Sequence, residues 1–318
     1  MVLSTQNLHL GNANVNLRFD HGMVSPAYKT YVITGCSVDL IAQWIKSDAA
    51  KRFFYNATTV GASVCRRNVE WDTLYEQSLY LPCRDEQEKV AKFLGLLSNR
   101  INKQQRFVSA LKKYKRGVTA KLIAAIEEKY PVVRLGDHVT VMRGGSPRPI
   151  DAYITNAENG IRWIKIGDAL PDQLYISDTK EKIKPEGAKK SRRVYAGDLI
   201  LSNSMSFGRP YILKVDGCIH DGWLLIRDEE KKFDKRFLCF YLASDVTLAQ
   251  YKKYAAGSCV NNLNSELVAS VEIGMPPIEQ QIRMANILEK IDRQVEAAST
   301  MYLLLSKLRS SLLQQLFI

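Results

Sequence analysis

Met275-Pro276-Pro277-Ile278-Glu279-Gln280-Gln281 introduces the most regular segment of the chain, a helical pattern that continues without a break to Ile318. From Met284 onward, apolar residues recur at alternating steps of four and three, with one polar break at Arg309. The positions on this seam are 284, 288, 291, 295, 298, 302, 305, 309, 312 and 316. Such a heptad pattern predicts a helix that packs along its length against another helix. Pro277 suits the first helical turn, and Glu279 places negative charge at the positive end of the helix dipole.

The predicted partner helix lies in the same chain. Leu81-Pro82-Cys83-Arg84-Asp85-Glu86-Gln87 introduces a second helical pattern with its seam at positions 90, 94, 97, 101, 104, 108, 111, 115, 118, 122 and 125. The two patterns superpose with a shift of 194 residues, so that the polar break at Lys115 falls on Arg309. A coincidental heptad would not keep its break in register, and we therefore interpret the segments as an internal repeat. The residues predicted to pair the helices are Leu94, Leu97, Ile101, Val108, Leu111, Leu288, Ile291, Val295, Leu305 and Leu312.

The composition of the 318 residues is that of a folded protein with an anionic partner. Hydrophobic residues make up 46% and charged residues 25%, which argues against global disorder. The net charge of +12 indicates a polyanion such as nucleic acid. The six cysteines include no Cys-x-x-Cys pair, so we expect reduced structural thiols. No apolar run reaches the length of a membrane span and no signal peptide is recognisable, so we expect a soluble, cytoplasmic protein.

The segments around the helices predict four parts: a partial strand-rich domain over 1–84, a long helix over 85–130, a complete α+β domain over 131–275 and a long helix over 276–318. The repeat matches from about residue 20, and Trp44-Ile45-Lys46-Ser47-Asp48 falls on Tyr241-Leu242-Ala243-Ser244-Asp245. Residues 131–196 find no counterpart, so we expect the first domain to be N-terminally truncated. Missing strands would expose unpaired edges and leave this domain poorly stable alone, or completed by other contacts.

Alternating and apolar runs predict the elements within the two domains. In the first domain they predict strands over 29–33 and 78–81 and a short helix over 37–56. In the complete domain they predict a helix over 233–253 and strands over 132–135, 139–143, 161–165, 198–202, 211–215, 222–226 and 271–274.

No catalytic motif stands out. The sequence contains no Asp/Asn-Pro-Pro-Tyr/Phe segment for holding a flipped base and no Gly-rich phosphate loop, since Gly144-Gly145 is a lone pair typical of a turn. The four histidines lack the spacing of a metal site. His220-Asp221-Gly222 suggests acid–base chemistry only weakly, and a structural turn is the favoured interpretation. We therefore expect a protein that is not an enzyme and binds no metal.

Basic and small polar side chains on the predicted turns of the complete domain are the candidate DNA contacts. Such residues bind phosphates and base edges. Segment 180–193 carries seven lysines and arginines against two glutamates, and segment 202–206 is polar directly after an apolar strand. A solvated lysine-rich loop and a structural Asn/Ser turn remain open as alternatives. The candidates are Arg143, Ser146, Arg148, Lys189, Lys190, Arg192, Arg193, Ser202, Asn203, Ser204, Ser206 and Arg209.

Two copies of a strand-rich domain followed by a proline and a Glu-Gln pair at the start of a long helix resemble the specificity subunits of type I restriction–modification systems. The resemblance covers nearly the whole chain. It is carried by Leu81-Pro82 with Glu86-Gln87, the segment 275–281, Trp163-Ile164-Lys165-Ile166-Gly167-Asp168, Gly197-Asp198-Leu199-Ile200-Leu201-Ser202-Asn203-Ser204, Phe207-Gly208-Arg209-Pro210 and Leu312-Leu313-Gln314-Gln315-Leu316-Phe317.

The resemblance implies an α+β fold in which target-recognition domains of mixed strands and short helices are joined by two long helices packed as an antiparallel coiled coil. Each domain would read half of a bipartite DNA sequence, and the helices would set the spacing between the halves. The implied partners are double-stranded DNA, methyltransferase subunits and an endonuclease/translocase subunit. This chain would bind no cofactor, whereas its partners would use S-adenosylmethionine, ATP and Mg.

The shortened first domain leaves two further possibilities open. Two copies of the chain could pair through this half and read a symmetric site. Alternatively, the chain is a truncated or recombination-derived remnant that binds partner subunits without recognising DNA.

Overall fold

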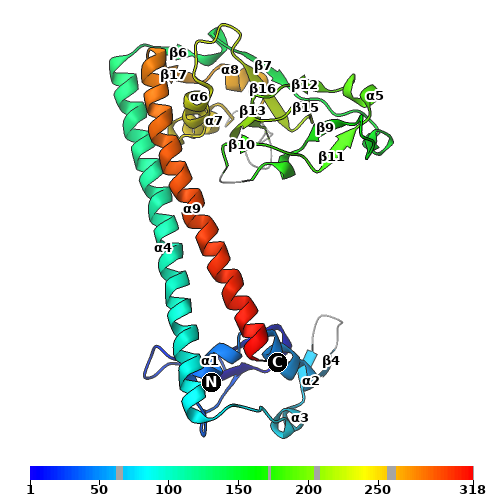
Figure 1. The fold of residues 1–318 in the computed structure, drawn as a ribbon, viewed down its shortest axis with the longest axis vertical. Helices are drawn as coiled ribbons and strands as arrows, with labels where there is room; N and C mark the ends of the chain where they lie inside the picture. Colours follow the sequence, from blue (N-terminus) through cyan, green and yellow to red (C-terminus); the bar gives the residue numbers. More distant parts are fainter. Residues whose placement is uncertain (62–66, 171–172, 204–207, 256–262, 318) are drawn as a thin grey trace. The chain divides into compact units, whose positions relative to one another are not determined.

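The computed structural model describes residues 1–61, 67–170, 173–203, 208–255 and 263–317, which form two compact units (Figure 1). Unit 1 comprises Met1–Val108 and Ala298–Ile318, and unit 2 comprises Ser109–Ala297. Two long helices, α4 (Arg84–Lys129) and α9 (Ile278–Leu316), contribute to both units. They confirm the predicted fold class of mixed strands and short helices joined by two long helices.

Unit 2 contains two five-stranded sheets within the described residues. The first has the order β10-β14-β13-β16-β7, with β7 (Thr140–Arg143), β10 (Tyr175–Ile176), β13 (Leu199–Ser202), β14 (Pro210–Leu213) and β16 (Trp223–Arg227). The second has the order β12-β15-β9-β11-β8, with β8 (Ile154–Thr155), β9 (Ile161–Ile164), β11 (Glu181–Ile183), β12 (Arg192–Val194) and β15 (Gly217–Ile219). A separate pair is formed by β6 (Val132–Arg134) and β17 (Glu272–Gly274).

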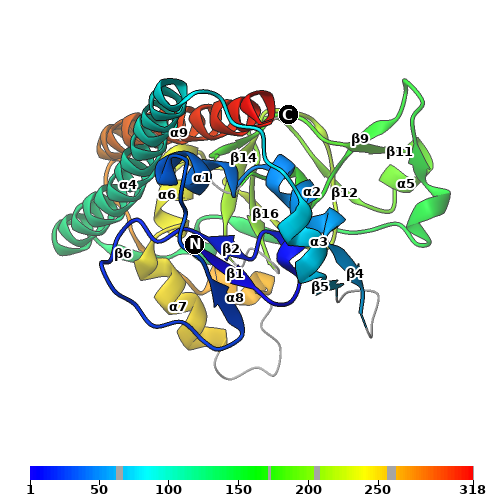
Figure 2. The ribbon, with the colours of Figure 1, turned by 90° about the horizontal axis from the view of Figure 1, so that it is seen from below.

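Short helices complete unit 2. They are η2 (Leu135–Asp137), η3 (Ile150–Ala152), η4 (Ile166–Asp168), α5 (Pro185–Ala188), α6 (Lys235–Leu242), α7 (Asp245–Ala255) and α8 (Ser265–Ala269). The second sheet and α5 lie on the side of the first sheet away from α6 (Figure 1, Figure 2). The order of layers is therefore helices, first sheet, second sheet.

Alternate side chains of the first sheet enter two different cores. Leu199 and Leu201 of β13 belong to the core that contains α6, whereas Ile200 belongs to the core between the two sheets. Strand β16 alternates in the same way, with Leu224 on the helix side and Leu225 on the second-sheet side. A strand that is buried on both faces needs an apolar residue at every position, which explains the unbroken apolar runs of β13 and β16.

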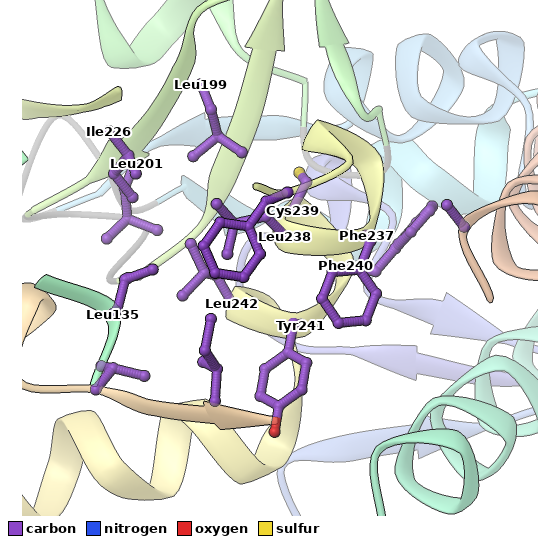
Figure 3. Close-up of a cluster of buried hydrophobic side chains, with 14 of the residues drawn as sticks. Leu135, Leu199, Leu201, Ile226, Phe237, Leu238, Cys239, Phe240, Tyr241 and Leu242 are labelled. Carbon is purple, nitrogen blue, oxygen red and sulfur yellow. The ribbon is translucent and has the colours of Figure 1, made fainter. Parts of the chain in front are cut away.

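Helix α6 lies at the centre of the helix-side core. The side chain of Asp234 caps it by accepting hydrogen bonds from the N–H groups of Arg236 and Phe237. Every residue from Phe237 to Leu242 is buried, and Figure 3 shows these side chains beside Leu199, Leu201 and Ile226 of the sheet. The Tyr241 hydroxyl donates to the carboxylate of Glu127 in α4 and accepts from an N–H group of β17. The helix thus ties the sheet to α4 and to the strand that precedes α9.

The predicted single helix over 233–253 is wrong, because the structure divides it into α6 and α7. The break lies at Ala243 and Ser244, and the Ser244 hydroxyl accepts from the N–H of Thr247 as a cap of α7. The predicted helix over 37–56 is divided in the same way into α1 (Val38–Trp44) and α2 (Asp48–Asn56), with Ser47 as the second cap.

The two long helices pack antiparallel within each unit. In unit 2, Lys115 of α4 forms a salt bridge with Asp292 of α9. In unit 1, Nε of Arg309 donates to Oγ of Ser98 at 2.9 Å. Under the shift of 194 residues, Lys115 corresponds to Arg309 and Ser98 corresponds to Asp292. The polar breaks of the two seams therefore meet equivalent polar partners.

All ten predicted seam residues are buried or half-buried, and Leu94 and Leu288 are completely buried. At the carboxyl end of each helix the buried face departs from the heptad. Ala125 and Leu316 are exposed, while Ile126 and Leu313 are buried. A straight helix drifts away from a 3.5-residue repeat, so a strict heptad cannot describe the last turns.

A buried glutamine joins each long helix to the globular part of its unit. Oε1 of Gln87 accepts from the N–H of Ser37 at 2.8 Å, and its Nε2 donates to the carbonyl of the proline five residues earlier. Gln281 repeats this arrangement with the N–H of Asp234, at 2.9 Å, and again with the carbonyl of the proline five residues earlier. Ser37 and Asp234 are the N-caps of α1 and α6. The glutamine therefore fixes the start of one helix to the start of another.

Unit 1 is a reduced counterpart of unit 2. Its three-stranded sheet has the order β2-β1-β3. Leu3 of the central strand pairs with Ala13 and Lys29, in the same way as Leu199 of β13 pairs with Ile212 of β14 and Ile226 of β16. Helices α1 and α2 correspond to α6 and α7. The repeat therefore extends to residue 3. The remaining bounds are β1 (Val2–Ser4), η1 (Leu8–Leu10), β2 (Ala13–Asn14), β3 (Tyr28–Thr30), β4 (Thr58–Val60), β5 (Arg67–Val69) and α3 (Trp71–Glu76).

The sheet of unit 1 has one apolar and one polar face. Leu3 enters a core with Leu8, Trp44 and Phe54. The opposite face carries Ser4, which stands at the register position of the buried Ile200 in unit 2. Asn14 and Tyr28 likewise replace buried leucines, and both are exposed. The predicted strand over 78–81 is wrong, since these described residues form no strand.

Candidate nucleic-acid interface

Four segments of unit 2 meet where strands of the two sheets end. They are the end of β7 with the loop to residue 148, the start of β12, the end of β13, and the turn 220–222. The turn leads from β15 in the second sheet to β16 in the first. It is therefore held by both sheets. We call the six residues that meet there, Arg143, Ser146, Arg148, Arg192, Asn203 and Asp221, the strand-end cluster.

Gly144 allows the main chain to pass close to this turn. Its N–H donates to the carbonyl of Trp223 at 2.8 Å, and the N–H of Gly145 donates to the carbonyl of Ile219 at 3.1 Å. A Cβ atom added at Gly144 would lie 2.1 Å from the carbonyl oxygen of His220. No side chain fits at that distance, so the approach of β7 to the turn requires glycine.

Asp221 connects most of the cluster. Its carboxylate accepts a hydrogen bond from Oγ of Ser146 at 2.7 Å and lies 3.4 Å from Nη2 of Arg148. Its main-chain carbonyl accepts from Nε of Arg143 at 3.2 Å and from Nδ2 of Asn203 at 2.8 Å. One residue thus holds side chains from β7, from the following loop and from the end of β13.

The charges of the cluster follow from these contacts. Burial opposes ionisation of Asp221, but the hydrogen bond from Ser146 and the neighbouring His220 and Arg148 outweigh it and lower the pKa of the carboxyl. Burial lowers the pKa of the His220 imidazole, which accepts a hydrogen bond from the N–H of Gly222. At neutral pH the cluster therefore combines one carboxylate with three guanidinium groups, and the neighbouring His220 is uncharged.

The three arginines of the cluster are exposed. Arg143 is anchored through Nε to the carbonyl of Asp221, and Arg192 is anchored through Nε to the carbonyl of Arg143, in both cases at 3.2 Å. A guanidinium has five N–H donors in a planar fork, and a bond through Nε uses one of them. This anchoring orients the exposed end of each guanidinium for a ligand with paired acceptors.

Two predicted contact residues lie behind this surface. Ser202 is completely buried, and its hydroxyl accepts from the N–H of Arg209 at 3.0 Å. Asn203 is 4% exposed, and its main chain bonds to Gly222 and Leu263. The prediction that these side chains contact DNA directly does not agree with their burial, and both side chains bond to main-chain groups of unit 2 instead. Ser204 and Ser206 lie outside the described residues.

The other predicted residues are distributed over separate places. Lys189 and Lys190 are exposed at the end of α5, and Nζ of Lys190 bonds to Oη of Tyr153 at 2.6 Å. Arg193 follows Arg192 on β12 and so points to the opposite face of the strand, beside buried Cys218. The basic tract therefore does not form one continuous surface.

The side chain of Arg209 lies apart from the cluster. It lines a cavity of about 580 Å³ together with Lys112 and Arg116 of α4. Arg116 is paired with Asp245 at 2.9 Å, and Asp292 is paired with Lys115 across the same cavity. This cavity has charges of both signs, in contrast to the arginine-rich cluster.

The sequence patterns missed the central residue, Asp221. They placed His220-Asp221-Gly222 on a structural turn, and the structure has a turn there. The available signal was an isolated acidic residue between two apolar strands of a basic domain. Within the described ranges, no group of three or more potential ligands could hold a metal ion, and no helix is long and apolar enough to cross a membrane. Cys36, Cys83, Cys218 and Cys239 are free thiols.

Comparisons with known proteins point to one family. A family model described as "Type I restriction modification DNA specificity domain" matches residues 127–301. The "Putative type I restriction enzyme MjaX specificity subunit" of Methanocaldococcus jannaschii is 24% identical over 302 residues, which cover 88% of this chain and 64% of that protein. The "Type I restriction enzyme MjaVIII specificity subunit" of the same organism is 24% identical over 277 residues, which cover 77% of this chain and 62% of that protein. The chain thus spans less than two thirds of the length of these relatives.

Two solved structures share the fold. The S subunit of a type I restriction–modification system from M. genitalium has a TM-score of 0.60 at 12% identity, over 88% of this chain and 72% of that chain. A chain from a structure titled as the basis of complex assembly and conformational transition of the type I R-M system has a TM-score of 0.56 at 18% identity, over 89% and 71% of the two chains.

Proposed function

The chain belongs to the family of type I restriction–modification DNA specificity domains, and on this premise we propose that unit 2 recognises a specific DNA sequence through its strand-end cluster. The observation that carries the proposal is the exposed position of three arginines, two bonded through Nε to main-chain carbonyls and the third, Arg148, beside the Asp221 carboxylate. As a specificity protein, the chain is a non-catalytic component that lends its selectivity to other subunits.

In this proposal the residues divide between two kinds of contact. Arg143 and Arg148 read base edges, because an oriented guanidinium forms paired hydrogen bonds with guanine. Lys189 and Lys190 bind phosphate and position the domain without reading sequence. The net charge of +12 supports the binding of a polyanion.

We also propose that methyltransferase subunits bind along the long helices and that an endonuclease/translocase subunit joins them. Those subunits supply S-adenosylmethionine, ATP and Mg, and this chain binds none of the three. The support in unit 1 is a set of apolar side chains outside the seam, with Phe93, Phe107, Met301 and Leu308 exposed by 53%, 54%, 45% and 49%. Apolar groups exposed in such number are typical of a surface that another protein covers.

The test of DNA recognition is the double variant Arg143→Ala with Arg148→Ala. We expect the affinity of the purified chain for duplex DNA to fall by about 10- to 100-fold, and the salt dependence to flatten if either side chain also contacts a phosphate. Arg134→Ala is the matched control, because Arg134 is an exposed arginine of unit 2 bonded to Ser270. Unchanged affinity and salt slope in the double variant, with thermal unfolding like that of the parent, would contradict the proposal.

The arrangement of the complex is tested in cells that express the chain with its methyltransferase subunit. Methylome sequencing and light scattering of the purified complex give the methylated motif and the number of copies. Two copies with a symmetric motif support pairing of two chains, and one copy with an asymmetric bipartite motif supports reading by both units. Assembly without any methylated motif favours the remnant that binds partners alone.

A further inference from the structure

We infer that Asp221 is the positioning residue of the reading surface: its carboxylate sets the geometry of the loop that carries Ser146 and Arg148, at a cost in overall attraction to DNA. This inference rests on the proposed function, because it assigns a role within the same site. Asp221 itself is not required to touch DNA.

The first argument is the pattern of bonds around the carboxylate. Ser146 both donates its hydroxyl to the carboxylate, at 2.7 Å, and accepts from the Asp221 N–H, at 3.3 Å. Arg148 approaches the other carboxylate oxygen at 3.4 Å while 74% of its side chain remains exposed. The carboxylate thus holds the loop after β7 at two points, the half-buried Ser146 and the exposed Arg148.

The second argument is electrostatic. A carboxylate on a surface that binds phosphate repels the ligand, and the Asp221 side chain is 44% exposed. The low pKa of the carboxyl keeps this charge present at neutral pH. A surface that served only to attract DNA would be better without it. Its place among three arginines fits a surface in which the direction of the guanidinium groups matters more than total charge.

The third argument separates the side chain from the main chain. Arg143 and Asn203 are bonded to the main-chain carbonyl of Asp221, and these bonds survive any side-chain substitution that preserves the turn. The variant Asp221→Asn therefore removes the charge while keeping shape and the main-chain bonds. The variant Ser146→Ala removes a contact of the carboxylate while keeping the charge.

The test measures selection and total binding together. The full chain is incubated with a library of DNA duplexes randomised at internal positions, and the bound fraction is sequenced. The affinity for the unselected library is measured in parallel. For Asp221→Asn we expect the enrichment of the parent's preferred sequence to fall by about 10-fold, the value of one misplaced base contact. We expect its affinity for the unselected library to stay equal or to rise, because a repulsive charge is lost.

Two further variants sharpen the result. Ser146→Ala should lower the enrichment without raising the affinity for the unselected library. Asp151→Asn is the same substitution at another exposed carboxylate of unit 2, and it should leave the enrichment unchanged.

The possible failures are distinguishable. If the parent enriches no sequence, the proposed function fails and this inference falls with it. If the parent enriches a sequence and Asp221→Asn enriches it equally, only the positioning role is overturned. The positioning role is also overturned if Asp221→Asn lowers the enrichment, the affinity for the unselected library and the melting temperature together. That result would indicate a purely structural role.

Discussion

Two neighbouring glycines, Gly144 and Gly145, meet very different surroundings. A Cβ atom at Gly144 would lie 2.1 Å from a main-chain oxygen, whereas at Gly145 the nearest atom is 3.5 Å away. We predict that Gly144→Ala lowers the free energy of unfolding by about 2–3 kcal/mol, because β7 must move away from the turn. Gly145→Ala, the matched control, should change it by less than about 0.5 kcal/mol. Denaturant unfolding measures both, and equal effects would contradict the close approach at Gly144.

Individual residues of the candidate site could be predicted from sequence only in part. Arg143, Ser146 and Arg148 were identified by residue type and by their place on a turn, and the structure brings them together. Asp221 was missed because its bond with Ser146 joins residues 75 positions apart. Ser202 and Asn203 follow an apolar strand and so were expected at the surface. Their polar groups instead pair with buried main-chain groups, which need partners wherever they lie.

The paired helices offer the sharpest comparison between neighbouring elements. Ile291 lies on the seam and is 7% exposed, whereas Ile287 lies outside it and is 45% exposed. We predict that Ile291→Asp destabilises the fold by about 3–5 kcal/mol, because it places a charge in an apolar seam. Ile287→Asp, the same change one turn away, should cost less than about 1 kcal/mol. Similar midpoints of thermal unfolding for the two variants would contradict the packing of α4 against α9.

Elements were predictable in proportion to their length. The long helices repeat one pattern over many turns, so the pattern predicts the buried seam correctly except in the last turns. Strands such as β8 and β10 have two residues each, and no periodicity can appear over that length. The division between α6 and α7 was missed because apolar spacing continues across it. The relevant signal was the capping residue Ser244 followed by Asp245, which the repeat also shows at Ser47 and Asp48.

Each unit has its own core, and the two cores should respond separately to damage. Phe54 is buried in unit 1, and Phe237 is buried in unit 2. We predict that Phe54→Ala, at a cost of about 3–5 kcal/mol, raises amide hydrogen exchange in α1 and α2 while β13 and β16 stay protected. Phe237→Ala should do the reverse. Exchange that rises equally in both units after either substitution would show a single cooperative fold.

Comparison of the two units explains why the repeat was visible in sequence only from about residue 20. The strands of unit 1 keep the pairing register of their counterparts but not their residues. Ser4 and Asn14 stand where unit 2 has Ile200 and Leu213, because no second sheet covers this face within the described residues. Strand pairing is made by the main chain, so it survives such exchanges while sequence similarity disappears.

The glutamines at the start of the long helices have a consequence for how such a chain can change. Among the described residues, the side chains of Gln87 and Gln281 bond to main-chain groups. The capping residues that they meet are different, Ser37 in one case and Asp234 in the other. These glutamine contacts therefore do not depend on which side chains the attached domain carries. A foreign domain that presents the N-cap of a helix at this place could be grafted onto the same pair of helices without redesign of this contact.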